Sequence, residues 1–375
     1  MKRLVYADNA ATTKLDIEAF EAMKPYLLDE YGNASQPYAF ARSPKAAIKK
    51  AREVIAKCIN AKPEEIYFTS GGTESDNWAI KGAALAHETR GAVIASAIEH
   101  HAVLRACASL ERLGVPVAYV WPNTDGVITQ DALSEIITNN TALVSVMMSN
   151  NETGVVQPIS ELAKIAHMHG AVFHTDAVQC LGHVSVDVQM LGVDILSASA
   201  HKFNGPKGVG FLYVKTGTPL IPLMDGGAQE KGNRAGTENV AAIVAMAVAL
   251  ENNLKHIGEQ REHITQLENL LLALLTEYGI NYVRNGAGEM VPGNISIGFP
   301  GFEGEAILHR LDLLGVQVST GSACDSVNTQ ISHVLKAMKV DTAIAKGTIR
   351  VSLGKYNNEE DVVFIADAIK KIING

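Results

Sequence analysis

Three short segments of the sequence place residues where they could do chemistry together. Lys202 lies among small and hydroxyl-bearing residues in SASAHKFNGPKG, a setting that suits an amine forming a Schiff base. Asp176 follows the apolar run Ala171–Thr175, so a strand would deliver its carboxylate to the edge where α/β sheets bind ligands. The turn SGGTES at residues 70–75 follows another apolar run and opens a helical pattern, so its backbone N–H groups could bind a phosphate.

Each segment taken alone also has an ordinary structural interpretation. A glycine–hydroxyl turn can be a plain helix cap, a lone aspartate can cap the next helix, and a loop lysine can be solvated. Neither GxxxxGK[ST] nor a GxGxxG after the first strand occurs, which argues against a P-loop and a dinucleotide site. Pyridoxal 5'-phosphate needs a phosphate cradle, an amine and a carboxylate facing its ring nitrogen. Gly72-Thr73, Lys202 and Asp176 supply these, and their combination predicts this cofactor.

One of the four cysteines stands in a loop suited to chemistry. Cys58 and Cys107 lie in helical patterns and Cys180 follows DAVQ, so we expect three packing thiols. Cys324 instead follows the Gly/Ser-rich STGSA, which is compatible with the mobility that a thiol visiting two partners requires. Because a thiol with a pKa near ~8.5 is mostly protonated at neutral pH, local activation is needed, for which His100 is the candidate. No CxxC pair occurs, which excludes zinc ribbons and dithiol redox sites.

Seven apolar runs alternate with helical patterns, which predicts an α/β fold with a mainly parallel seven-stranded sheet. We expect strands at Ile66–Thr69, Ala92–Ser96, Val117–Trp121, Ala142–Met148, Ala171–Thr175, Asp194–Ser197 and Val209–Val214. Helices are expected at Ser75–Ala86, Val103–Leu113, Asp131–Thr138 and Ile159–His169. The carboxyl ends of parallel strands meet at one edge of a sheet, so the three chemical segments should meet there.

The pattern changes after residue 214, where a second domain is expected. A long helical stretch from about Asn239 to Glu277 has the character of a connector. Beyond it, we expect strands at Asn294–Phe299, Gln317–Ser319 and Thr348–Leu353 and helices at Glu303–Leu313 and Glu359–Ile373. The predicted organisation is a large cofactor-binding domain over residues 15–254 and a smaller α+β domain. The smaller domain comprises residues 1–14 and 255–375 and carries the Cys324 loop.

The composition of the 375 residues narrows the class of protein further. With 32 Lys and Arg against 40 Asp and Glu, the net charge is −8, which argues against direct nucleic-acid binding and against anionic membranes. The N-terminus MKRLVYADNAATT has no apolar h-region, and the longest apolar run, Val240–Leu250, is too short to span a bilayer. We therefore expect a cytoplasmic protein in a reducing compartment.

The ordered set of motifs resembles that of the cysteine desulfurases, of the NifS and IscS type, in the class V aminotransferase family. The resemblance runs from DNAATT at residues 8–13 to IRVSLG at residues 349–354. Between them lie SGGTESDN, EHHAVL, NNETGVVQP, DAVQ, SASAHKFNGPKG, NRAGTENV and STGSAC, in family order. The resemblance implies the pyridoxal-phosphate-dependent transferase fold type I and a homodimer. It also implies conversion of L-cysteine to L-alanine with a persulfide on Cys324, which a sulfur acceptor collects.

The resemblance also implies roles for single residues. Catalysis would rest on Cys324 as the nucleophile, Lys202 as the covalent anchor of the cofactor and His100, which would stack on the cofactor ring. Arg350, with Asn151, would clamp the substrate carboxylate, a task that suits the bidentate guanidinium. The full cofactor set would comprise Gly72, Thr73, His100, Asn151, Asp176, Gln179, Ser199, His201 and Lys202, with Thr237 reaching the phosphate held by the other subunit.

The sequence departs from the family's usual residues at Ala34, Tyr38, Ala41 and Ala228. Three other functions stay open: a selenocysteine lyase or another class V enzyme, simple transamination, and a noncatalytic relative acting as a scaffold. The GSAC context favours the cysteine-directed enzymes, and the retained lysine, aspartate and arginine argue against a scaffold. No metal site is expected, because the histidines lack the HExxH spacing. An iron–sulfur scaffold or a thiolation enzyme is the expected sulfur acceptor.

Overall fold

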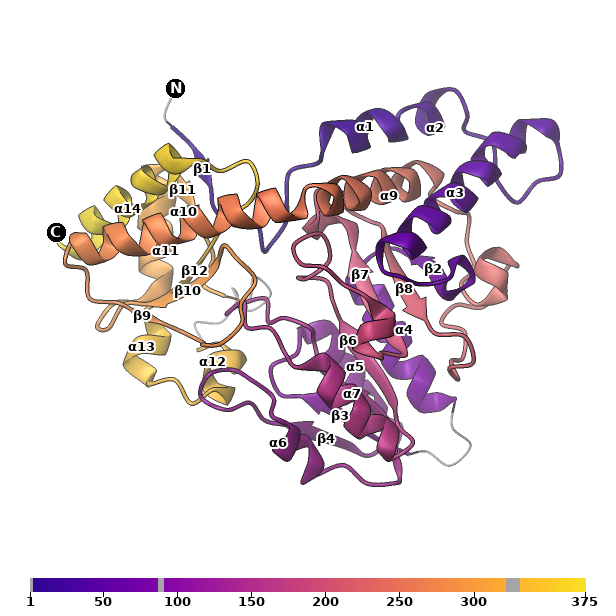
Figure 1. Cartoon of the computed structure of the whole chain (residues 1–375), viewed down its shortest axis with the longest axis horizontal. Coiled ribbons are helices and arrows are strands. Elements are labelled where there is room, and N and C mark those ends of the chain that lie inside the picture. Colours follow the sequence, from indigo (N-terminus) through magenta and orange to yellow (C-terminus); the bar gives the residue numbers. More distant parts are fainter. Residues whose placement is uncertain (1–2, 87–90, 322–330) are drawn as a thin grey trace.

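The computed structural model of the chain describes residues 3–86, 91–321 and 331–375 (Figure 1). Its centre is a sheet of seven strands in the order β2-β8-β7-β6-β5-β3-β4. Strands β3 to β7 pair in parallel, whereas β8 pairs antiparallel with both β7 and β2. The mainly parallel seven-stranded sheet expected from the sequence is confirmed. Its strands are β2 (Ile66–Thr69), β3 (Ala92–Ser96), β4 (Val117–Val120), β5 (Thr141–Ser145), β6 (Val172–Asp176), β7 (Ile195–Ser199) and β8 (Gly210–Val214).

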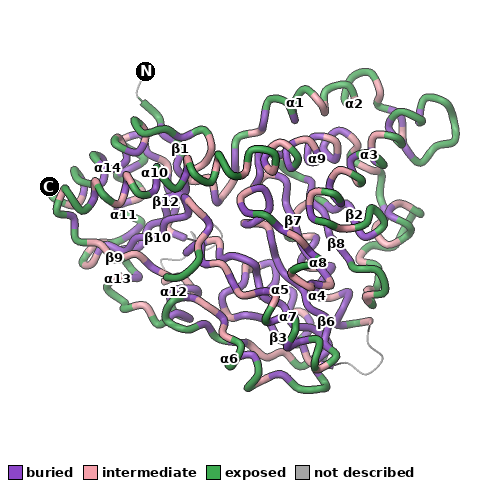
Figure 2. The backbone as a smooth tube through the Cα atoms, viewed as in Figure 1, coloured by how far each residue is buried: buried purple, intermediate pink, exposed green. Residues whose placement is uncertain are grey.

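Helices cover this sheet, and four of its strands are buried along their whole length. Strands β5, β6, β7 and β8 are buried at every residue, which explains their continuous apolar sequences (Figure 2). Helix α4 (Gly72–Leu85) packs against all four of these strands. The other helices that follow strands of this sheet are α5 (His101–Arg112), α6 (Gln130–Ser134), α7 (Ile159–Met168) and α8 (Val188–Leu191). Helix α4 therefore carries its residues directly onto the central strands.

The long helical stretch expected from Asn239 to Glu277 is two helices rather than one. Helix α9 (Val240–Lys255) and helix α10 (Ile257–Glu277) meet at His256 and are bent by 72°. Helix α9 packs against α1 (Ile17–Met23) and α3 (Arg42–Cys58), near the short α2 (Pro25–Leu28). Helix α10 packs against α14 (Glu359–Ile373) (Figure 1). Among the described residues, no single helix is long and apolar enough to span a membrane. Only the bent pair of α9 and α10, taken together, has the length and apolar composition of such a span.

A second hydrophobic cluster joins the first residues of the chain to its last third. Strands β9 (Val283–Arg284), β10 (Asn294–Gly298) and β12 (Thr348–Ser352) form an antiparallel sheet. Strand β1 (Val5–Tyr6) pairs in parallel with β11 (Val316–Gln317), and Val5 and Ala7 belong to the cluster. The remaining helices are α11 (Gly304–Leu314), α12 (His333–Ala337) and α13 (Thr342–Lys346). The residue borders expected for the two domains stay a prediction.

Candidate active site

A cavity of about 530 Å³ lies at the carboxyl-end edge of the central strands. Most of the site residues expected from the sequence line it: Gly72, Thr73, His100, Asn151, Asp176, Gln179, Ser199, His201, Lys202 and Arg350. Cys324 lies outside the described residues, but Gly321, the described residue nearest before it, lines the same cavity. Thr237 instead lines a smaller cavity of about 220 Å³, which shares Ser70 and Gly208 with the large one.

The amine of Lys202 is held inside the cavity by the N-terminal segment. The lysine ends a short 3-10 turn, η3 (Ala200–Lys202), directly after strand β7. Its Nζ donates to the carbonyl oxygens of Ala10, at 2.6 Å, and Ala11, at 2.9 Å. Gln179 donates its Nε2 to the same Ala10 carbonyl at 2.9 Å. The first dozen residues of the chain thus fix the position of the amine.

Asp176 presents a buried carboxylate at the end of strand β6. The residue is 5 % exposed, and its Oδ1 accepts a hydrogen bond from the backbone N–H of Val178 at 2.9 Å. Burial raises the pKa of Asp176 to about 6, against the opposing effects of that N–H group and of the Lys202 charge. A carboxylate that still ionises at neutral pH suits a protonated ring nitrogen.

The start of helix α4 forms the anion-binding end of the cavity. Gly71 caps the helix with φ +146°, a conformation that side-chain-bearing residues rarely adopt. A Cβ added to Gly72 would lie 2.9 Å from Val178 Cγ2, so only glycine leaves room for the backbone there. Ser199 stands beside this turn at the end of β7. Free N–H groups at the start of a 14-residue helix favour a phosphate.

A partly buried ion pair connects this turn to the loop that carries Thr237. Glu74 accepts two hydrogen bonds from the guanidinium of Arg234, at 2.8 and 3.1 Å, and a third from the backbone N–H of Ser70 at 3.0 Å. The pKa of Glu74 is lowered because these bonds outweigh its burial, which acts in the opposite direction. The two cavities therefore share a rigid wall.

His100 and His201 are both neutral histidines of the cavity. His100 caps helix α5, and its Nδ1 accepts the backbone N–H of Ala102 at 3.1 Å, so the ring proton is on Nε2. Burial, with the nearby Lys202 charge, lowers the pKa of His100 to about 4. The same two causes lower the pKa of His201 to about 4, and its Nδ1 lies 3.1 Å from Thr12 Oγ1. An uncharged His100 can stack on an aromatic ring and can donate a hydrogen bond from Nε2.

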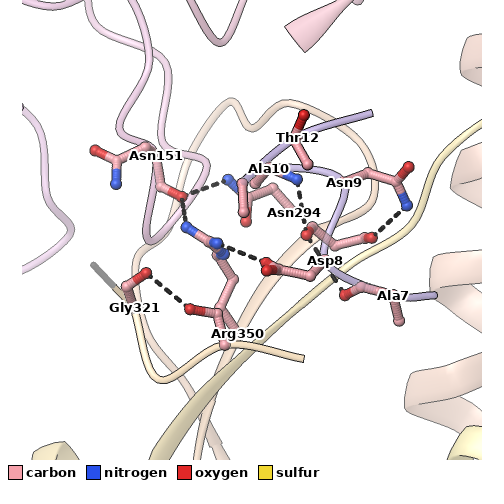
Figure 3. A network of polar contacts seen from close by, with 12 residues as sticks. Ala7, Asp8, Asn9, Ala10, Thr12, Asn151, Asn294, Gly321 and Arg350 are labelled. Atoms are coloured by element: carbon pink, nitrogen blue, oxygen red, sulfur yellow. Dashed lines mark hydrogen bonds and ion pairs between the residues drawn. The ribbon is translucent and has the colours of Figure 1, made fainter. Parts of the chain in front are cut away.

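Arg350 reaches the cavity from strand β12 with its guanidinium held in place (Figure 3). It is 2 % exposed, its Nη2 donates to Asp8 Oδ1 at 2.7 Å, and its Nη1 donates to the backbone carbonyl of Asn151 at 2.9 Å. Its Nε has no hydrogen-bond partner among the described residues. The side-chain amide of Asn151 extends away from the guanidinium (Figure 3). A guanidinium fixed by two contacts and retaining further donors suits a substrate carboxylate.

The three described cysteines are poor nucleophiles. Burial raises the pKa of Cys58 to about 11 and those of Cys107 and Cys180 to about 12. Cys107 and Cys180 are fully buried, as expected for packing thiols, while Cys58 is partly buried at the end of α3. All three thiols are therefore mainly protonated at neutral pH.

The sequence model of the family Aminotransferase class-V matches residues 5–364. The chain belongs to the class V aminotransferase family. It is 48% identical over 375 residues to a protein named cysteine desulfurase IscS from Dictyoglomus turgidum, covering 100% of this chain and 95% of that protein. A solved structure named NifS-like protein matches with a TM-score of 0.93 at 37% identity, covering 99% of this chain and 100% of the other. A structure described as SspA in complex with cysteine matches with a TM-score of 0.84 at 36% identity, covering 96% and 100%.

This class V aminotransferase has a cavity that fits the family's cofactor, pyridoxal 5'-phosphate. This cofactor requires an amine, a carboxylate that faces its ring nitrogen and a turn that binds its phosphate. The cavity offers the amine of Lys202, the buried carboxylate of Asp176 and the tight glycine turn before α4. Among the described residues, no group of three or more His, Cys, Asp or Glu side chains could hold a metal ion.

Several residues around the cavity escaped the analysis of the sequence. Asp8 pairs with Arg350, Glu74 anchors the phosphate turn, and Asp76 lines the cavity beside Asp176. Each lies inside a motif on which the family resemblance is based. The motifs indicate that the segment matters, but they do not show which of its polar side chains point into the cavity. The departures Ala34 and Ala228 line a third cavity of about 390 Å³ and do not line the large one.

Proposed function

We propose that this class V aminotransferase is a cysteine desulfurase that converts L-cysteine to L-alanine and leaves the sulfur as a persulfide on Cys324. One observation carries the proposal: a single cavity is lined by Lys202, Asp176 and Arg350, and also by Gly321, which lies three residues before Cys324. The similarity to a protein named cysteine desulfurase, and to one solved with cysteine, supports the same substrate.

When bound, pyridoxal 5'-phosphate supplies an electron sink for the bonds at the α-carbon of an amino acid. Lys202 would bind it covalently, Asp176 would face its ring nitrogen, and the backbone of Gly72 and Thr73 would bind its phosphate. Arg350 orients the substrate by its carboxylate, which sets the α-proton and the side-chain sulfur in fixed directions. The Lys202 amine lies in the cavity, where it would take the α-proton and return it.

The sulfur step needs a thiolate from this chain. The Cys324 thiolate attacks the substrate sulfur, a new S–S bond forms, and the C–S bond breaks with its electron pair passing to carbon. Protonation of that carbon completes L-alanine, so the step requires no outside oxidant or reductant. The high pKa values of Cys58, Cys107 and Cys180 support the assignment to Cys324.

We also propose a cytoplasmic homodimer that passes the sulfur to an iron–sulfur scaffold or a thiolation enzyme. The family resemblance is the ground for the homodimer; in the single chain, Thr237 lines a cavity that shares Ser70 and Gly208 with the cofactor cavity of the same subunit. The name IscS of a full-length relative supports an iron–sulfur acceptor.

The test compares the wild-type holoprotein with Cys324→Ala and, as a matched control, Cys58→Ala. With L-cysteine, the wild type and Cys58→Ala should release alanine and gain the mass of one sulfur atom, whereas Cys324→Ala should do neither. Full activity of Cys324→Ala on L-cysteine would refute the proposed nucleophile. Activity of that variant on L-selenocysteine alone would favour a selenocysteine lyase, and amino transfer without sulfur release would favour a transaminase. A colourless protein that does not respond to added cofactor would contradict an enzymatic role.

A further inference from the structure

A second carboxyl group, that of Asp76, lies beside Asp176 in the wall of the cavity. It comes from helix α4, which packs against strands β6 and β7, and it is 1 % exposed. Both carboxyl groups line the cavity. Asp76 Oδ1 is buried without a hydrogen-bond partner among the described residues, an arrangement that strongly disfavours a charge on that oxygen.

Asp76 ends a row of uncharged hydrogen-bonding groups that crosses the sheet. Ser145 Oγ lies 2.9 Å from His174 Nδ1, and His174 Nε2 lies 2.9 Å from Ser197 Oγ. The hydroxyl of Ser197 also bonds to the Asp76 carboxyl group, whose Oδ1 is 3.7 Å from His174 Nε2. His174 is fully buried, and burial lowers its pKa to about 3, so it is neutral and brings no positive charge to Asp76.

The remaining charged groups around the pair favour a proton on Asp76 rather than on Asp176. Asp176 accepts a backbone N–H group and is stabilised as an anion by the Lys202 charge. Asp76 has only the Ser197 hydroxyl, and the carboxyl groups of Asp176 and Glu99 both act against its ionisation. Two buried anions side by side repel each other strongly, so ionisation of one disfavours ionisation of the other.

We propose that Asp76 is a positioning residue that stays a neutral carboxylic acid and thereby confines the single negative charge of the pair to Asp176. The ring nitrogen of pyridoxal 5'-phosphate then faces one localised charge rather than a charge shared between two carboxyl groups. The neutral acid also holds Ser197 and, through it, the ring of His174. This inference rests on the cofactor of the family and not on the sulfur chemistry of the proposed function.

The protonation of Asp76 can be read directly from infrared spectra of the protein without cofactor or cysteine. At neutral pH, the wild type minus Asp76→Asn difference spectrum should contain a carboxylic-acid C=O band and no carboxylate band. Asp187→Asn is the matched control: Asp187 caps helix α8 with a carboxylate whose pKa is lowered, chiefly by the backbone N–H of Met190, so a carboxylate band should be lost there. Because Glu99 is also buried and its pKa is raised to about 8, Glu99→Gln identifies its separate acid band. Loss of a carboxylate band in Asp76→Asn would overturn the proposal.

The positioning role is tested by spectroscopic titration of the apoprotein with pyridoxal 5'-phosphate. Asparagine is neutral and keeps the shape and hydrogen-bonding groups of the acid. Asp76→Asn should therefore bind pyridoxal 5'-phosphate with a Kd within about threefold of wild type, whereas the Kd of Asp176→Asn should rise about 100-fold. Asp76→Leu removes the contact to Ser197, so its affinity for the cofactor should fall about tenfold. Its thermal melting shows whether the variant is folded. In loaded protein, Asp76→Asn should also leave the pH dependence of the visible absorbance unchanged. A loss in Asp76→Asn equal to that in Asp176→Asn, or wild-type affinity in a folded Asp76→Leu, would contradict the proposal.

Discussion

Replacing Arg350 by lysine tests how the cavity recognises its substrate. The guanidinium is 2 % exposed and is fixed by Asp8 at 2.7 Å and the Asn151 carbonyl at 2.9 Å. A lysine keeps the positive charge but loses the planar fork, so it cannot keep these contacts and grip a carboxylate at two points. The lost charge-assisted hydrogen bond is worth about 1.5–3 kcal/mol, which corresponds to roughly a 10- to 150-fold fall in kcat/KM for L-cysteine.

The assay compares L-cysteine with cysteamine, which has the same amine and thiol but no carboxylate. Arg350→Lys should lose activity on L-cysteine while its reaction with cysteamine and its cofactor absorbance stay unchanged. Arg310→Lys is the control away from the cavity, because Arg310 is exposed, bonds to the carbonyl of Ile372 at 3.2 Å and does not line the cavity. This control variant should retain the wild-type kcat/KM for both L-cysteine and cysteamine.

Two results would refute this reasoning about Arg350. If Arg350→Lys kept kcat/KM for L-cysteine within about threefold of wild type, the guanidinium would not hold the carboxylate through two bonds. If the variant lost activity equally on L-cysteine and cysteamine, the substitution would have disturbed the site as a whole. Thermal melting of the variant separates the second result from a loss of folding.

Three further predictions follow from groups in or beside the cavity. Because the folded-state pKa of His174 is lowered from 6.5 to about 3, the unfolded chain binds more protons between these values, and stability falls as the pH drops through them. Denaturant unfolding at about pH 4.5 and 7 should show wild type losing about 2.5 kcal/mol more stability than His174→Gln. Lys202→Ala should lose the covalent cofactor, so dialysis should remove the visible absorbance that wild type retains. Gly72→Ala would place its Cβ 2.9 Å from Val178 Cγ2 and should weaken cofactor binding in a titration, whereas Gly258→Ala, with open space around it, should not.

The sequence predicted those parts of the molecule that depend on local patterns. Strand β2 and helix α14 occur at the residues expected, and the strands ending near Asp176 and Ser199 meet at one edge, as parallel pairing requires. The expected residues around Lys202 therefore gather in one cavity.

The features that were not predicted depend on contacts distant in sequence. The bend at His256 lies two residues before Gly258, and the helices on either side of it, α9 and α10, pack against different partners. The pairing of Asp8 with Arg350 spans 342 residues and leaves no local signal. Asp76 falls within a polar helix start, where side-chain direction depends on the sheet beneath it.

The contacts of the N-terminal segment set the order in which the protein can mature during synthesis. Ala10 and Ala11 can bind only after Lys202 has been made, and Asp8 can pair only with Arg350, which is made 342 residues after it. The central sheet can fold earlier from its own residues, because chains generally fold domain by domain as they emerge. A nascent chain would therefore hold a formed sheet but an incomplete catalytic cavity. The cavity is complete only when residues 8–11 dock against Lys202 and Arg350.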